Sequence, residues 1–175
     1  MFFQKLSSAR CERPQIRFIA SLYDTKGSDK ITQRLPFSVG IDIVSIDRID
    51  RAFRRYPSFA SRILTTEEMS EMVVVDEDEG QHLPPVRRNV EFLASRYAVK
   101  EAASKSLHIN LFSISFHDFS VSKHPIGYPI LAVSERIKRR FGEFSEVTFE
   151  VSISHERRYA VAVVNSFLSK GEEEN

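Results

Sequence analysis

A predicted helix that carries an acid and a base beside a stripe of alanines places the strongest constraint on this fold. One face of this helix repeats every four residues: Leu93, Tyr97, Glu101 and Lys105. At about 3.6 residues per turn, side chains with this spacing lie above one another. The neighbouring stripe is almost free of side chains: Ala94, Ala98 and Ala102. Another element can therefore pack closely on the helix, and its charged face suits a ligand.

Length and composition predict one soluble domain. The chain has 175 residues, of which 42% are hydrophobic and 28% charged, values typical of a globular protein. A net charge of +1 argues against a dedicated nucleic-acid binder. No apolar run reaches the roughly 20 residues of a membrane helix, so we expect no membrane partner. Cys11 is the single cysteine, which excludes an internal disulfide and a cysteine-based zinc site.

The N-terminal segment differs in composition from the rest of the chain. Residues 1–23 are rich in arginine and serine and contain one acidic residue, Glu12. This composition is typical of a mitochondrial transit peptide, and a disordered extension is the alternative. We therefore divide the chain into an extension (1–36), a folded domain (37–168) and a disordered tail (169–175). The protein is expected in the mitochondrial matrix if the extension is a transit peptide, and in the cytoplasm otherwise.

The hydrophobic periods predict an α+β fold in which a largely antiparallel sheet packs against one long helix. A strand over 37–44 precedes a helix that begins at Ile46 and ends at Tyr56-Pro57, because proline disfavours helical geometry in the residue before it. The later elements, in chain order, are a helix over 66–73 opened by a Thr65–Glu68 capping box, an acidic and proline-containing loop over 76–85, the long helix over 89–107, strands over 116–122 and 130–133, a helix over 134–141 and a hairpin over 147–164.

Asp42 is a second unusual carboxylate, far from Glu101 in sequence. It lies in a predicted strand whose opposite face carries Val39, Ile41 and Ile43, although aspartate is depleted in strands. If Asp42 and Glu101 converge, they can bind Mg²⁺, which takes its remaining ligands from water and phosphates. The sequence thus predicts a metal site with two carboxylates.

Two lysines next to Glu101 extend this prediction to a phosphorylated ligand. Lys100 and Lys105 would neutralise phosphate oxygens that the metal does not reach. The structural alternative is an exposed Glu101–Lys105 pair, worth about 0.2–0.5 kcal/mol. Because that pair gives no account of Asp42, a metal-and-phosphate site is the more complete interpretation.

Two further features have a functional and a structural interpretation. His155 ends the predicted strand that contains Ser154, where an imidazole could contact a phosphate or simply face solvent. The helix over 46–56 exposes four arginines: Arg48, Arg51, Arg54 and Arg55. They form either a solvated face or a docking surface for an acidic partner.

Three motifs in order resemble one known family, the holo-acyl-carrier-protein synthases, the small bacterial-type branch of the 4'-phosphopantetheinyl transferases. They are Gly-Ile-Asp-Ile-Val at 40–44 followed by Arg48, Phe-Leu-Ala-Ser-Arg-Tyr-Ala-Val-Lys-Glu-Ala-Ala-Ser-Lys at 92–105, and Ser-Ile-Ser-His-Glu-Arg-Arg-Tyr-Ala at 152–160. The segment 59–65 with Glu68 adds a fourth match. The resemblance covers about residues 38–166.

The resemblance implies an activity and a fold. The family transfers the 4'-phosphopantetheine group of coenzyme A to a serine of an apo acyl carrier protein, releases adenosine 3',5'-bisphosphate, and serves fatty acid synthesis. It implies the 4'-phosphopantetheinyl transferase fold and a homotrimer whose active sites lie between neighbouring subunits. Two rival functions stay open: a non-catalytic subunit that binds coenzyme A or a carrier protein, and another Mg²⁺-dependent phosphoryl or nucleotidyl transferase.

The resemblance also implies a role for each matching residue. Asp42 and Glu101 would hold Mg²⁺ against the pyrophosphate. The candidate base is Glu101 or a metal-bound water, and Lys105 is the catalytic phosphate contact. The other roles follow as a set: Arg96 and Lys100 steady the phosphates or the helix, Ser154 and His155 lie near the nucleotide of coenzyme A, and Arg48, Arg51 and Arg55 dock the carrier protein. The sequence departs from the family at residues 107–111, which lack its glycine-rich turn, and at Tyr128 in its Gly-Lys-Pro turn.

Overall fold

The computed structural model describes residues 37–56, 58–72, 87–142 and 146–169. All of them belong to one of the two units of the chain, Pro36–Asn175. The predictions for the extension (1–36), the loop (76–85) and residues 170–175 lie outside the described residues. Among the helices described, none has both the length and the apolar character needed to cross a membrane.

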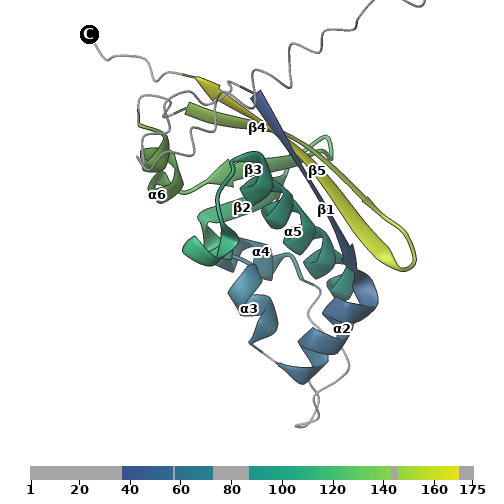
Figure 1. The fold of residues 1–175 in the computed structure, drawn as a ribbon. Coiled ribbons are helices and arrows are strands. Elements are labelled where there is room, and N and C mark those ends of the chain that lie inside the picture. Colours follow the sequence, from purple (N-terminus) through teal and green to yellow (C-terminus); the bar gives the residue numbers. More distant parts are fainter. Residues whose placement is uncertain (1–36, 57, 73–86, 143–145, 170–175) are drawn as a thin grey trace, which may run out of the picture. The chain divides into compact units, whose positions relative to one another are not determined.

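The strands form two antiparallel sheets (Figure 1). One sheet has the order β1-β5-β4 and is built from β1 (Phe37–Ser45), β5 (Tyr159–Ser169) and β4 (Glu146–His155). The other is a hairpin of β2 (Phe119–Lys123) and β3 (Pro129–Val133). The predicted α+β class with antiparallel strands is confirmed. β5 reaches Ser169, one residue beyond the expected end of the domain.

The main helices lie where the sequence predicts them, and the smaller ones differ. They are α2 (Ile46–Arg55), α3 (Phe59–Ile63), α4 (Thr66–Ser70), α5 (Arg87–Ser106) and α6 (Glu135–Lys138), with 3₁₀ turns η1 (Leu111–Ser113), η2 (Phe116–Asp118) and η3 (Arg139–Phe141). The capping box of α4 is confirmed: Thr65 Oγ1 accepts from Glu68 N, and Thr65 N donates to Glu68. α3 was not predicted. η2 replaces the start of the predicted strand 116–122, because a second capping box joins Ser115 and Asp118.

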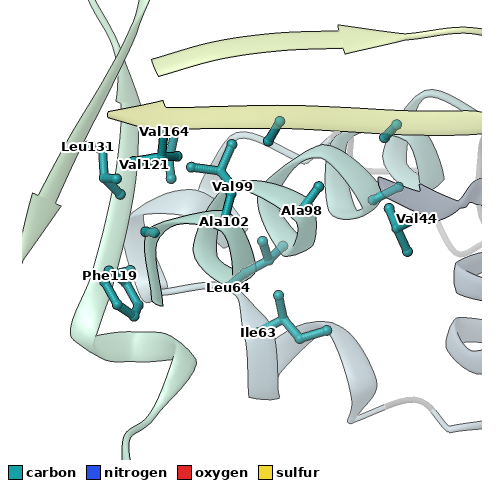
Figure 2. Packing of buried hydrophobic residues seen from close by; sticks show 14 of the residues in the cluster. Val44, Ile63, Leu64, Ala98, Val99, Ala102, Phe119, Val121, Leu131 and Val164 are labelled. Carbon is teal, nitrogen blue, oxygen red and sulfur yellow. The ribbon is translucent and has the colours of Figure 1, made fainter. Parts of the chain in front are cut away.

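The alanine stripe of α5 packs against the three-stranded sheet, as its small side chains predict. Ala94, Ala98 and Ala102 are fully buried, and Figure 2 shows Ala102 and Val99 of α5 beneath Val164 of β5. The core continues on the other sides of the helix through the hairpin and α3, with the labelled side chains Phe119, Val121, Leu131, Ile63 and Leu64 (Figure 2). α5 is therefore the central element of the core.

Gly40 allows β1 to approach α5 more closely than any other residue could. A methyl group at Gly40 would overlap the backbone carbonyl oxygen of Ala102 and lie 2.6 Å from Ser106 N. Both obstacles are backbone atoms of a buried helix, so neither can move aside easily. Glycine at this position brings the strand that carries Asp42 onto the helix that carries Glu101.

The end of α5 explains how the chain turns without the glycine-rich segment of the family. His108 adopts a left-handed conformation with φ of 54°, and Ile109 N donates to Ser104 O at 2.9 Å. This pattern resembles the helix ends at which glycine usually takes the left-handed position. The side chain of His108 also contacts Ser38 Oγ at 3.1 Å, so the turn is tied to β1.

Candidate active site

Asp42, Glu101 and Lys105 form a surface cluster between β1 and α5. Lys105 Nζ lies 2.8 Å from Asp42 Oδ1 and 3.8 Å from Glu101 Oε1. It also donates to Ile41 O at 3.2 Å. The Lys105 side chain is 47% exposed, whereas the Asp42 side chain is 11% exposed. Two carboxylates that are 59 positions apart in sequence thus share one cation at the edge of the sheet.

The strand register explains why Asp42 faces this cluster. Gly40, Asp42 and Val44 alternate toward α5, whereas Ile41 and Ile43 face away and are 61% and 62% exposed. The predicted alternation of β1 is confirmed, but the apolar face is the exposed one. An aspartate on the inner face therefore marks the place where the core opens to the surface.

The two carboxylates of this cluster could bind a divalent cation whose other ligands come from water and a bound phosphate. The Lys105 ammonium already lies near both carboxylates, so a positive charge is accommodated between them. Within the described parts of the chain, no group of three or more His, Cys, Asp or Glu side chains could hold a metal. Two carboxylates alone suit Mg²⁺, which usually keeps water and phosphate oxygens as its other ligands.

Lys100 does not reach the surface cluster, because it lies in the core. Its side chain is fully buried, and Nζ donates to Glu68 Oε2 at 2.5 Å and to Ile63 O at 2.7 Å. Burial lowers the pKa of Lys100, and the Glu68 carboxylate opposes that shift. The interpretation of Lys100 as a phosphate contact does not fit this position. The alternative, that it steadies the helix, does.

Glu68 completes the interior cluster, which we define as Lys100, Glu68 and Arg96. Glu68 accepts hydrogen bonds from Thr65 N at 2.8 Å and Val121 N at 2.9 Å in addition to Lys100. It thereby joins α4, α5 and β2 at one buried point. The capping-box pattern predicts Glu68 in the first turn of a short helix, but it carries no information about the contact with Lys100.

Arg96 is also directed away from the surface cluster. Its guanidinium lies 4.4 Å from the centre of the Phe92 ring and 3.4 Å from Glu71 Oε2. Burial lowers the pKa of Arg96, and Glu71 and Glu68 oppose the shift. Among the described residues, Arg96 Nε has no hydrogen-bond partner. This position places Arg96 with the core rather than with the carboxylates Asp42 and Glu101.

Ser154 and His155 lie at the end of β4 that is near Asp42, on opposite faces of the sheet. In the register, Asp42 pairs with Ala162 of β5, which pairs with Ile153 of β4, so the end of β4 is close to Asp42 along the sheet. His155 lies two residues after Ile153 in the strand, so the two side chains are on the same face of the sheet as Asp42. Ser154 belongs to the outer face. Both are exposed.

The arginines of α2 divide into a paired and an unpaired set. Arg54 Nε is bound to Asp50 at 2.9 Å. In the part of the chain that the structure describes, Arg48, Arg51 and Arg55 form no ion pair, and all three are exposed. Ser45 caps the helix by accepting from Arg48 N. Because Ser45 ends the strand that carries Asp42, α2 begins at Ile46, four positions after Asp42.

Tyr97 belongs to the site as well, although the sequence analysis gave it no role. Burial raises the pKa of Tyr97, and the negative charge of Glu101 raises it further. Its place on the face that includes Glu101 and Lys105 was the available signal. A tyrosine one turn before a half-buried glutamate has its hydroxyl within reach of the carboxylate.

The antiparallel α+β fold sets two carboxylates and a lysine beside a basic helix, an arrangement that suits a phosphorylated ligand. Known proteins identify the class more closely. The chain matches the family model of the 4'-phosphopantetheinyl transferase superfamily over residues 38–164. The chain therefore belongs to this superfamily.

Relatives within the superfamily are holo-acyl-carrier-protein synthases. The chain is 39% identical over 128 residues to the enzyme of Vibrio campbellii, with 72% of this chain and 93% of that protein covered. The enzyme of Bacillus anthracis, solved in complex with CoA (3',5'-ADP), is similar with a TM-score of 0.56 and 33% identity over 75% of this chain and 96% of that one. The enzyme of Helicobacter pylori in complex with coenzyme A gives a TM-score of 0.57 and 30% identity over 75% and 99%. The resemblance found in the motifs is confirmed.

Proposed function

We propose that this protein transfers the 4'-phosphopantetheine group of coenzyme A to a serine of an apo acyl carrier protein and releases adenosine 3',5'-bisphosphate. The observation that carries the proposal is the convergence of Asp42 and Glu101 around the Lys105 ammonium. The relatives named holo-acyl-carrier-protein synthase support the reaction, and two of their structures contain coenzyme A or its nucleotide part. Fatty acid synthesis is the process that such a carrier protein would serve.

The residues of the surface cluster divide the chemistry between them. The serine oxygen forms a bond to the β-phosphorus of coenzyme A, and the bond from that phosphorus to the oxygen of the departing bisphosphate breaks. Glu101 accepts the serine proton, because it is the half-buried carboxylate on the open side of the cluster. The Lys105 side chain is about half exposed, so its ammonium can turn from Asp42 to the phosphate oxygens, where it stabilises developing charge.

Asp42 and Glu101 are the residues that would hold Mg²⁺. When bound, the ion would neutralise charge on the pyrophosphate and fix its orientation. Asp42 is the better anchored ligand, since it lies in a strand within the sheet and its side chain is mostly buried. Of the remaining nucleotide contacts predicted from sequence, His155 shares the face of Asp42 and is retained here, together with Ser154 at the outer face.

The carrier protein would dock on α2. Arg48, Arg51 and Arg55 are exposed without ion pairs among the described residues, so their charge is available to an acidic partner. The helix starts directly after the strand of Asp42. A carrier protein bound to α2 would thus present its serine close to Glu101.

A homotrimer is part of the same proposal, and the outer face of the sheet supports it. Four apolar side chains of β1 are at least half exposed on that face: Phe37, Val39, Ile41 and Ile43. In the register they lie beside Phe167, Asn165, Val163 and Val161 of β5. An exposed face that is apolar except for Asn165 is typical of a subunit interface. Ser154 lies on it, so a neighbouring subunit would lie next to the end of β4.

Replacing Ile41 by glutamate is expected to break the trimer. The charge would be buried without a partner in the interface, whereas in a monomer it would face water. Light scattering coupled to size exclusion should give the mass of one chain for Ile41→Glu, with transfer reduced at least about tenfold. Met69→Glu, an exposed apolar position on α4, is the matched control and should stay assembled. A trimeric Ile41→Glu variant would contradict this interface.

Intact-mass spectrometry of an apo acyl carrier protein tests the reaction itself. After incubation with the enzyme, coenzyme A and Mg²⁺, the carrier should gain one phosphopantetheine group on a serine. A carrier that binds but gains no mass would indicate the non-catalytic subunit. Gain of a nucleotide or a bare phosphate would indicate another transferase.

The location in the cell stays a separate proposal. The basic, serine-rich composition of residues 1–36 supports import into the mitochondrial matrix, with a cytoplasmic enzyme as the alternative. N-terminal sequencing of the protein from cells would decide, because an imported protein would begin near residue 37.

A further inference from the structure

In the part of the chain that the structure describes, one edge of β1 is free of strand pairing. β1 is the outermost strand of the sheet β1-β5-β4, so β5 covers only one of its two edges. The register between these strands ends at the pair Ser45–Tyr159. Directly beyond it, Ile46 N donates to Arg158 O at 2.9 Å. Because bonded and non-bonded pairs alternate in an antiparallel ladder, the even-numbered residues of β1 bond to β5, and the odd-numbered ones direct their N–H and C=O groups away from it.

The outward backbone groups at the centre of this edge, which we call the open edge, belong to Val39, Ile41 and Ile43. Among the described residues, no backbone hydrogen bond outside the sheet joins any of the three to another segment. The Lys105 ammonium donates to Ile41 O at 3.2 Å, which agrees with an outward direction of this carbonyl. The same ammonium lies 2.8 Å from Asp42 Oδ1. One lysine therefore joins the surface cluster to the open edge.

An open strand edge can bind an extended chain that carries amide groups, because its own N–H and C=O groups are unpaired. At the Ser45 end, the open edge leads into α2, the helix on which the carrier protein would dock (Figure 1). At the other end it continues through Val39 toward Phe37. Coenzyme A extends from its β-phosphate into the pantetheine arm, a flexible chain with secondary amides. With the phosphate at Lys105, the arm has the open edge beside it, and the direction away from α2 is left for it.

The spacing of the open edge fits the first amide of this arm. Strand residues rise by about 3.4 Å each, so the outward groups of Ile41 and Val39 are about 7 Å apart. The bonds from the β-phosphorus to the first amide carbon of the arm span about 6 Å when extended. If the phosphate lies beside Lys105, next to Ile41 O, the first amide carbonyl is level with Val39 N–H. This N–H is fixed by the sheet, so the arm finds its donor already in place.

We infer that the open edge of β1 binds the pantetheine arm of coenzyme A, with Val39 N–H donating to the first amide carbonyl of the arm. The inference rests on the proposed function, since it takes coenzyme A as the substrate. It goes beyond that function by assigning recognition of the transferred group to the backbone of an edge strand, next to the side chains that would hold the phosphates.

Amide hydrogen exchange of the wild-type protein, followed residue by residue by NMR with Mg²⁺ present, tests the contact without a substitution. Saturating coenzyme A should slow exchange of the Val39 amide at least about fivefold. Adenosine 3',5'-bisphosphate, which lacks the arm, should leave it unchanged. The amide of Ile43, which lies on the α2 side of Asp42, should exchange equally fast with either ligand.

Val39→Pro tests the same contact through affinity. Proline removes the N–H and is tolerated at a sheet edge where that N–H points outward. Calorimetry with Mg²⁺ present should give coenzyme A binding about fivefold weaker than wild type, the effect of one lost hydrogen bond, with unchanged binding of adenosine 3',5'-bisphosphate. Ile43→Pro removes another outward N–H of the open edge and is the matched control. Its two affinities should keep the wild-type ratio.

These results separate the inference from the proposed function. A wild-type protein that transfers phosphopantetheine while coenzyme A leaves the exchange of the Val39 amide unchanged would overturn the inference alone. A Val39 amide that is already protected in the free protein would do the same, since another segment would then cover the edge. The exchange measurement decides even if Val39→Pro does not fold. A protein that protects Val39 with coenzyme A but transfers nothing would support the inference and overturn the transferase.

Discussion

Two lysines of one helix, Lys100 and Lys105, each meet a carboxylate, yet their surroundings differ completely. Lys100 is fully buried, and Glu68 and Ile63 O take up its ammonium at 2.5 and 2.7 Å. Lys105 is about half exposed and lies 2.8 Å from Asp42. The buried pair joins three elements, whereas the exposed pair has solvent on one side.

The difference shows how one sequence motif can supply both stability and chemistry. The Glu68 carboxylate accepts from a lysine and two backbone N–H groups, so both of its oxygens are engaged, and its burial keeps a ligand from solvent away. The carboxylates of the surface cluster share one exposed cation and keep oxygens free for another ligand. Burial, and not residue type, therefore separates the structural lysine, Lys100, from Lys105, to which we assign a role in the reaction.

Glu101→Gln should give the largest effect on function with the smallest effect on the fold. The amide keeps the shape of the side chain but can neither accept the serine proton nor bind a cation strongly. We expect transfer to fall at least about 1,000-fold while the melting temperature stays within about 2 °C of wild type. The transfer rate and thermal unfolding followed by circular dichroism check both statements. A fully active variant would remove Glu101 from the mechanism.

Glu68→Gln should produce the opposite pattern. It leaves the Lys100 ammonium buried without a counter-charge, a change that typically costs about 3–5 kcal/mol. Chemical denaturation should show a loss of unfolding free energy in this range. The transfer rate per folded molecule should stay within about threefold of wild type. A variant as stable as wild type would contradict the structural role of the interior cluster.

A third ion pair, Asp118 with Arg136, is less buried than the Lys100–Glu68 pair. Its loss should give the smallest effect of the three, a pH-dependent change in the free energy of unfolding. The Asp118 side chain is 9% exposed and that of Arg136 53%. Hydrogen bonding to Arg136 lowers the pKa of Asp118 to about 2. Since the folded-state pKa is below that of the unfolded chain, the unfolded state binds more protons as the pH falls. The Asp118 carboxylate should therefore stabilise the fold above pH ~4 and lose this stabilisation as the pH falls toward about 2.

Comparing the unfolding free energies of wild type and Asp118→Asn from pH 7 to pH 2 measures this contribution. Wild type should have the higher unfolding free energy at pH 7, and the two curves should converge in acid. Parallel curves across the whole range would show that the Asp118 carboxylate does not stabilise the fold through its charge.

Periodicity and capping signals predicted most of the fold because they act locally. The alternation of β1, the proline after α2 and the Thr65–Glu68 box each follow from a few neighbouring residues. α3 was missed because five residues give too little periodicity. The predicted strand 116–122 begins too early, since its first residues form η2. The Ser115–Asp118 capping box of η2 directly precedes β2, so the two run together in the apolar pattern.

The site was predictable where a residue contradicted its local pattern. Asp42 in an apolar strand pointed to the surface cluster, and helical spacing linked Glu101 with Lys105. The burial of Lys100 was not predictable, because α5 is enclosed on several sides and the spacing of its residues does not reveal which sides. The partner of Lys100 comes from α4, and only the packing of distant elements brings Glu68 to it.

The transfer rate per folded molecule, measured side by side for Glu101→Gln and Glu68→Gln, tests the central claim most directly. Intact-mass analysis of the carrier protein gives the rate, and circular dichroism of the same samples gives the folded fraction. The account predicts a folded and inactive Glu101→Gln and a destabilised Glu68→Gln whose folded molecules transfer phosphopantetheine at nearly the wild-type rate. An active Glu101→Gln, or a folded and inactive Glu68→Gln, would contradict the division of α5 into a structural and a functional cluster.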